Sequence, residues 1–182
     1  MNNQNNKKFS VKKLTVSAIF IALISLLTSF SFAIPGGHGY IHLGDSMIYT
    51  CAWALGGPIA GIVSALGSAL TDVMLGYTQY VPATLIIKFL MGYVAYLIMK
   101  AFKYKYSANI FAMIVSSIIM VVGYTFFEYL LDKAGAVAVI VPNLIQAVGG
   151  VVTGAAVILL LDNISAFSPY ISWKANKKDE RN

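Results

Sequence analysis

The chain has 182 residues, of which 58% are hydrophobic and only 11% are charged, and its mean hydropathy is +0.75. Soluble domains carry roughly 25% charged residues, so this composition excludes an ordinary soluble domain and favours lipid as the surrounding solvent. The net charge of +6 comes from basic residues at the two ends and in one short loop, a distribution typical of membrane orientation and not of a nucleic-acid-binding face.

The apolar runs predict an all-α membrane protein, a bundle of six transmembrane helices in a single integral membrane domain over residues 1–182. A spanning helix needs about 20 apolar residues. We place the spans at residues 14–33, 46–55, 59–76, 82–99, 108–131 and 136–161. A Gly-rich outer loop follows the first span, and the tails at 1–10 and 165–182 are expected to be frayed and cytoplasmic. The lone Cys51 excludes an internal disulfide and reads as a small core residue.

The orientation follows from the basic residues. Six crossings place the N-terminal tail, the loop at 100–105 and the C-terminal tail on one side, and these segments hold 11 of the 13 Lys and Arg residues. The positive-inside rule therefore predicts that both termini are cytoplasmic. The same rule requires the short apolar segment at 46–55 to cross the membrane, because otherwise the N-terminal lysines and the basic loop at 100–105 would lie on opposite sides. An alternative for the first span is a signal peptide that ends at Ser31-Phe32-Ala33.

Three charged residues fall inside predicted spans: Asp72, Lys88 and Glu128. Charges within a bilayer are costly and therefore indicate function. All three lie in the outer halves of their spans, as do Asn143 and Gln146, which share a helix face. We interpret this convergence as a binding pocket open to the outside. The alternatives are that the three charges only neutralise one another or that they reach the outer surface by snorkelling.

The loop at 34–45 contains both histidines of the chain and four glycines, which allow it to fold over a pocket. A lid or substrate contact is the preferred interpretation; an ordinary outer loop and a metal site are the alternatives. Outer tyrosines add aromatic surface, although some belong to an aromatic belt. The predicted substrate-binding residues are His38, Tyr40, His42, Asp45, Asp72, Tyr77, Tyr80, Lys88, Tyr124, Glu128, Asn143 and Gln146, with no metal site among them.

Several motifs are missing from the sequence. It has no G-x-x-x-x-G-K-[ST] phosphate loop, no H-E-x-x-H motif and no arguable Ser-His-Asp arrangement. We therefore expect neither enzyme activity nor a bound cofactor. A transporter subunit is the preferred class. A self-sufficient small transporter or channel, and a membrane enzyme or assembly factor, are the alternatives.

The chain resembles the substrate-binding S components of energy-coupling factor (ECF) transporters. The resemblance rests on the six spans, the lysine-rich start, Ala18-Ile19-Phe20-Ile21-Ala22, the Gly-rich first outer loop, and His42-Leu43-Gly44-Asp45 followed by Gly56-Gly57-Pro58. It implies a bacterial plasma-membrane protein that captures a water-soluble vitamin. It also implies docking on a transmembrane scaffold subunit, driven by ATP through two cytoplasmic ATPase subunits. The resemblance further implies that Ala18 and Ala22 face the scaffold subunit and that the first outer loop acts as a gate to the substrate pocket.

The resemblance also ranks the substrates. Tyrosines, amides, one lysine and carboxylates suit a small aromatic heterocycle, which stacks on aromatic rings and is oriented by a few polar groups. The sequence is most similar to members that bind hydroxymethylpyrimidine, the thiamine precursor. Pyridoxine is the next expectation, and the larger riboflavin follows.

Overall fold

A computed structural model describes residues 11–34, 36, 38–171 and 173–174. The elements, in chain order, are α1 (Val11–Ser29), β1 (Ser31–Ala33), β2 (Tyr40–His42), α2 (Asp45–Ala54), α3 (Gly57–Met74), the 3-10 helix η1 (Thr78–Tyr80), α4 (Val81–Ala101), α5 (Tyr106–Leu131), α6 (Lys133–Ala138), α7 (Ile140–Asn163) and the 3-10 helix η2 (Ser165–Tyr170). The mostly helical architecture confirms the predicted class.

Within the described part of the chain, five helical segments are long and apolar enough to cross a membrane. The second predicted span, residues 46–55, corresponds to α2, whose ten residues are too few for it to be among these five segments. The last predicted span is divided at Val139 into α6 and α7. The first was predicted to reach Ala33, but α1 ends at Ser29 and residues 31–33 form a strand.

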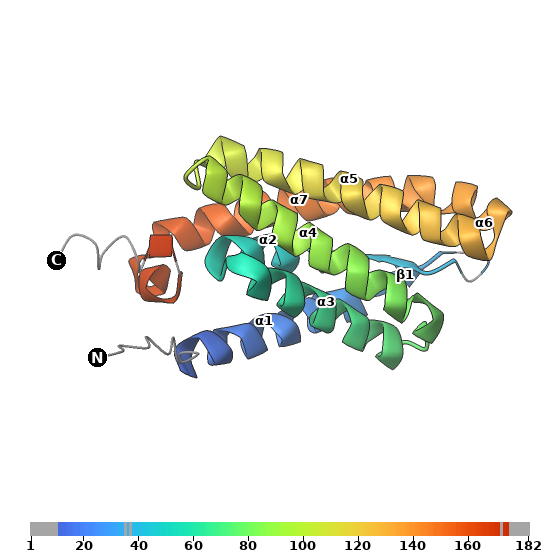
Figure 1. Cartoon of the computed structure of the whole chain (residues 1–182), viewed down its shortest axis with the longest axis horizontal. Coiled ribbons are helices and arrows are strands. Elements are labelled where there is room, and N and C mark those ends of the chain that lie inside the picture. Colours follow the sequence, from blue (N-terminus) through green and yellow to red (C-terminus); the bar gives the residue numbers. More distant parts are fainter. Residues whose placement is uncertain (1–10, 35, 37, 172, 175–182) are drawn as a thin grey trace, which may run out of the picture.

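The predicted tails are only partly described. Residues 1–10 and 175–182 lie outside the described residues. Where the second tail was expected to be frayed, residues 165–170 form η2 instead. Figure 1 shows that the start of α1, η2 and the α4–α5 turn lie at one end of the bundle, which we call the termini end. The hairpin tip, η1 and α6 lie at the other, the hairpin end.

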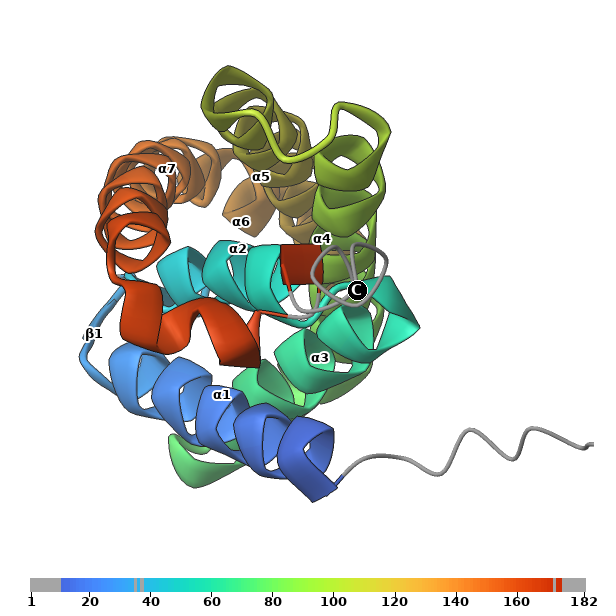
Figure 2. The ribbon, with the colours of Figure 1, turned by 90° about the vertical axis from the view of Figure 1, so that its left-hand side faces the viewer.

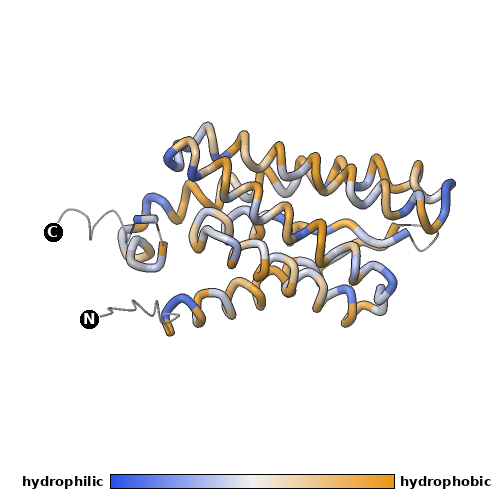
Figure 3. Tube along the Cα trace, in the orientation of Figure 1, coloured by the Kyte–Doolittle hydropathy of each residue, from blue (hydrophilic) through white to orange (hydrophobic). Residues whose placement is uncertain are grey.

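The helix α2 occupies the centre of the bundle. Every one of its ten residues is buried, and it packs against α7, α4, α1 and α3. Figure 2 views the bundle along its length and shows α2 enclosed by the longer helices. The longer helices carry the exposed apolar side chains, and hydrophilic residues gather at the two ends in Figure 3. This distribution is the one expected of a bundle whose sides face lipid.

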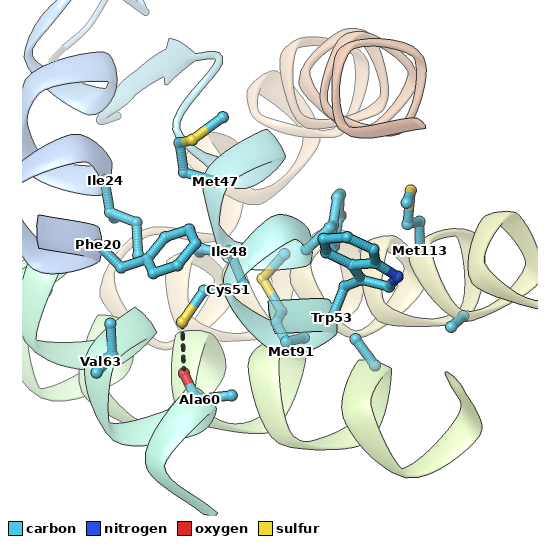
Figure 4. Close-up of a cluster of buried hydrophobic side chains, with 14 of the residues drawn as sticks. Phe20, Ile24, Met47, Ile48, Cys51, Trp53, Ala60, Val63, Met91 and Met113 are labelled. Carbon is cyan, nitrogen blue, oxygen red and sulfur yellow. Dashed lines mark hydrogen bonds between the residues drawn. The ribbon is translucent and has the colours of Figure 1, made fainter. Parts of the chain in front are cut away.

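The core between α1, α2, α3 and α4 is built from apolar side chains of mixed size. Figure 4 shows Cys51 among Phe20, Ile48 and Val63, with its thiol directed at the Ala60 carbonyl oxygen. Cys51 has no exposed surface, so its predicted role as a small core residue is confirmed.

Small residues allow the helices to approach closely. A Cβ atom at Gly61 would come within 2.9 Å of the Phe89 carbonyl oxygen on α4, and one at Gly154 within 3.1 Å of the Tyr49 ring on α2. Gly61 and Gly154 therefore serve close helix packing, whereas an added Cβ atom at Gly57 would meet no neighbour within 4 Å. In contrast, Ala18 and Ala22 lie on the exposed face of α1.

Candidate functional site

The Gly-rich loop after the first helix is a β-hairpin and not an irregular loop. Strands β1 and β2 pair antiparallel with Phe32 opposite Ile41. The amide of Ile34 donates to the carbonyl oxygen of Gly39 at 2.9 Å and closes the turn. Gly36 and Gly39 both have a φ of +89°, a left-handed conformation that favours glycine. β-Branched and aromatic residues in the flanking segments favour the strands.

The tip of the hairpin is tied to α5. The His38 Nδ1 lies 2.7 Å from Glu128 Oε1, and the Tyr80 hydroxyl donates to Glu128 Oε2 at 2.6 Å. Glu128 is buried, whereas a fifth of the His38 side chain is exposed. Gly135 of α6 makes room for this contact, because a Cβ atom there would lie 2.5 Å from His38 Nδ1. The Asp132 carboxylate holds α6 in place by accepting from the first amides of that helix.

The middle of the hairpin contacts α3 through Tyr40, whose hydroxyl donates to Asp72 Oδ1 at 2.6 Å. The phenol is the donor in this contact, because a carboxylate can only accept a hydrogen bond. The ring of Tyr40 packs on Tyr77 at a centroid distance of 5.0 Å, and Tyr77 packs on Tyr80. These contacts form an aromatic wall at the hairpin end.

The base of the hairpin is held by a buried ion pair. The ammonium group of Lys88 lies 2.5 Å from Asp45 Oδ1, and neither side chain has more than 1% of its surface exposed. Gln146 donates to Asp45 Oδ2 at 2.8 Å and accepts from the His42 backbone amide at 3.1 Å. Strand β2 is thereby linked to α2, α4 and α7 at once. The alternative in which Lys88 neutralises Asp72 and Glu128 is wrong, because Asp45 is the partner of Lys88.

The ring of His42 holds the turn between β2 and α2. The Gly44 amide donates to His42 Nδ1 at 3.0 Å, which leaves the ring hydrogen on Nε2. Glycine is required at position 44, since a Cβ atom would lie 2.0 Å from Thr28 Oγ1.

These elements enclose a cavity of about 40 Å³ at the hairpin end. A volume of that size holds about three water molecules. The lining residues are Thr28, Ile34, His38, Gly39, Tyr40, His42, Ser68, Asp72, Tyr80, Thr84, Lys88, Tyr124, Glu128, Val139, Asn143 and Gln146. They come from α1, the hairpin, α3, η1, α4, α5 and α7 and the Val139 connection, so helices far apart in the sequence meet at one level.

Ten of the twelve residues predicted for the site line this cavity. The other two are Asp45 and Tyr77. Asp45 was expected in the loop, but it is the first residue of α2. Its carboxylate accepts a hydrogen bond from the Lys88 ammonium group, and Asp45 itself does not line the cavity. Tyr77 packs against Tyr40 and Tyr80. Their predicted contact with substrate stays a prediction.

Sequence reasoning missed several lining residues, most notably Thr28, Ser68 and Thr84. A signal for one of them was present, because Ser68 precedes Asp72 by four residues and therefore shares its helix face. Across the described ranges, no group of three His, Cys, Asp or Glu side chains is placed to hold a metal ion. The two histidines have separate partners, Glu128 for His38 and the Gly44 amide for His42.

Comparisons with known proteins agree with this architecture. Residues 8–173 match the family described as ECF-type riboflavin transporter, S component. The chain is 34% identical over 155 residues to the thiamine precursor transporter HmpT of Lactococcus lactis, a match that covers 84% of this chain and 86% of that protein. It is also 34% identical over 122 residues to an uncharacterized protein of Pyrococcus woesei, covering 66% of this chain and 81% of the relative.

Among solved structures, the fold is similar to one described as the S component of a bacterial ECF transporter. The TM-score is 0.66 at 23% identity, and the match covers 86% of this chain and 97% of the other. At that identity the likeness concerns the fold alone. The family match spans most of the chain, and the apolar helices agree with it. The chain is therefore a multi-pass membrane protein that belongs to the S-component family of ECF-type transporters.

Proposed function

We propose that this chain captures hydroxymethylpyrimidine, a thiamine precursor, at the outer face of the bacterial plasma membrane for ATP-driven uptake. The observation that carries the proposal is the enclosed polar cavity at the hairpin end, to which five of the longer helices or their connections contribute side chains. The identity to a thiamine precursor transporter over most of both chains supports the same ligand class.

The size and lining of the cavity favour a small ring. Tyr40, Tyr80 and Tyr124 offer aromatic surface, and Asn143 and Gln146 offer amide groups that fix orientation. A space of about 40 Å³ is smaller than any vitamin, so the hairpin must move when a ligand enters. A one-ring compound requires less movement than riboflavin. Hydroxymethylpyrimidine therefore ranks first, pyridoxine second and riboflavin third.

The proposed topology has both termini in the cytoplasm. The helix α2 is roughly 15 Å long, about half of the hydrocarbon thickness of a bilayer. We propose that the hairpin and α2 together make the second of six crossings. Extended backbone is tolerated at membrane depth when it is enclosed by protein. The strand β2 is partly buried and packs against α7 and α1, and α2 is buried throughout. This crossing places the basic residues of the termini end on the cytoplasmic side.

The proposed partners are a transmembrane scaffold subunit and two cytoplasmic ATPases. The sequence lacks a phosphate loop of its own, so the energy of ATP must come from other chains. Ala18 and Ala22 lie one turn apart on the exposed face of α1. Small residues at this spacing allow a partner helix to approach closely in lipid.

A direct binding titration tests the proposal. The purified chain in detergent is titrated with hydroxymethylpyrimidine, pyridoxine and riboflavin by isothermal titration calorimetry. We expect the first to bind tightest. Asn143→Ala should weaken that binding at least tenfold, whereas Asn109→Ala should not, because Asn109 is equally buried but lies at the termini end of α5. Tightest binding of riboflavin, or equal effects of the two variants, would refute the proposal.

A further inference from the structure

The wall of the cavity between α1 and α3 carries polar atoms without protein partners. Among the described residues, Thr28 Oγ1, Ser68 Oγ and Asp72 Oδ2 are buried and accept or donate no hydrogen bond. All three residues line the cavity, and each has at most 4% of its surface exposed. Buried polar groups are nearly always hydrogen-bonded, so three unpaired atoms on one wall call for an explanation.

Local structure does not supply partners for these atoms. Other hydroxyl groups on the same two helices are paired: Ser25 donates to the Gly67 carbonyl oxygen, and Thr71 donates to Ser25. On α4, the Thr84 hydroxyl pairs with the Tyr124 hydroxyl at 2.9 Å, and it can donate its own hydrogen to the Asp72 carboxylate when Tyr124 donates to it. On α1 and α3, the three unpaired atoms all belong to residues that line the cavity; the other unpaired buried atoms of the described chain belong to residues outside its lining, namely Asn109, Ser116, Thr125 and Trp173.

The three groups have a defined hydrogen-bonding pattern. Asp72 Oδ1 is already used by the Tyr40 hydroxyl, so Oδ2 remains as an acceptor for a ligand. The hydroxyl groups of Thr28 and Ser68 can each donate to a ligand. Ser68 precedes Asp72 by one helical turn on α3, so an acceptor and a donor lie side by side.

We infer that Thr28, Ser68 and Asp72 form a subsite for the edge of an aminopyrimidine, in which an amino group lies beside a ring nitrogen. The amino group donates to Asp72 Oδ2, and the adjacent ring nitrogen accepts from a hydroxyl group of Ser68 or Thr28. This inference rests on the proposed function and adds the orientation of the ligand. It also gives a reason to select hydroxymethylpyrimidine over pyridoxine, whose ring nitrogen has no amino neighbour.

The test compares hydroxymethylpyrimidine with an analogue in which a ring carbonyl replaces the amino group. In that analogue the ring nitrogen carries the hydrogen, so donor and acceptor exchange places. Charge-assisted hydrogen bonds predict that the wild-type protein binds the amino compound roughly 10- to 100-fold more tightly. Asp72→Asn should reverse part of this preference, because the asparagine amide can donate to the carbonyl. A misfolded variant would bind neither compound.

Ser68→Ala supplies a second measurement. It should weaken binding of the amino compound and raise the apparent melting temperature of the ligand-free protein, because it removes an unpaired buried hydroxyl group. Ser116→Ala is the matched control: Ser116 is also buried and unpaired within the described chain, but it lies outside the cavity. It should leave affinity unchanged.

The outcomes separate the two proposals. A wild-type protein that binds neither pyrimidine refutes the proposed substrate and the subsite with it. A wild-type protein that binds both equally, or an Asp72→Asn variant with an unchanged preference, refutes the subsite alone. Equal loss of affinity in Ser68→Ala and Ser116→Ala would also overturn the subsite.

Discussion

Replacing Lys88 by methionine tests how far the buried ion pair stabilises the bundle. Methionine keeps most of the volume of the lysine side chain but removes its charge. Asp45 then retains one partner, the Gln146 amide at 2.8 Å, in a position where none of its surface is exposed. The variant therefore leaves a buried carboxylate without a compensating charge.

The magnitude follows from the depth of the pair. Removal of one partner from a buried ion pair costs about 3–5 kcal/mol of folding free energy. At about 2–4 °C per kcal/mol for a protein of this size, the apparent melting temperature should fall by roughly 6–20 °C. The double variant Asp45→Asn with Lys88→Met carries no charge at either position of this pair and should recover most of this loss, since neutral replacements of buried pairs are often tolerated.

The assay is a thermal unfolding series on the ligand-free protein in one detergent, with the wild type, both single variants and the double variant. A double-mutant cycle gives the coupling between the two side chains. A melting temperature of Lys88→Met equal to that of the wild type would contradict the reasoning. Strictly additive losses in the double variant would do so as well, because they would show that the two charges act independently.

Two further predictions concern the hairpin and the outer face of α1. Glu128→Gln weakens the contact between α5 and His38, so we expect faster ligand dissociation in stopped-flow measurements; an unchanged dissociation rate would show that this contact does not help to close the hairpin. Ala18→Trp should abolish uptake in cells while the purified variant still binds ligand, because the larger ring blocks close helix approach.

A matched control accompanies the docking prediction. For the docking prediction, Val122→Trp places the same ring on an exposed position of α5. Uptake should survive there, and an equal loss in both tryptophan variants would count against a docking role for Ala18.

Much of the architecture could be predicted because hydropathy is a local property. A run such as Tyr106–Leu131 must be a spanning helix wherever it packs, since its length and apolar character are set by the bilayer. The convergence of Asp72, Lys88, Glu128 and Asn143 at one level also follows from counting residues along each helix. All four line the same cavity.

The pairing between elements could not be predicted in the same way. Asp45 is a loop residue by sequence, yet it begins α2 and meets Lys88, because β2 packs against α1 and α7 and leads directly into α2. That path depends on the strand pairing around Gly36 and Gly39, which a Gly-rich segment does not specify. The side of α1 on which Thr28 lies depends on how α1 packs against α3, and helical spacing alone leaves this rotation open.

The measurement that tests the central claim most directly is mass spectrometry of small molecules retained by the purified wild-type protein, beside a Glu128→Ala variant prepared in the same way. We expect a pyrimidine with a hydroxymethyl group to accompany the wild type and to be depleted in the variant. Retention of an unrelated molecule, or equal retention of the pyrimidine by both proteins, would contradict a nutrient site in the cavity at the hairpin end.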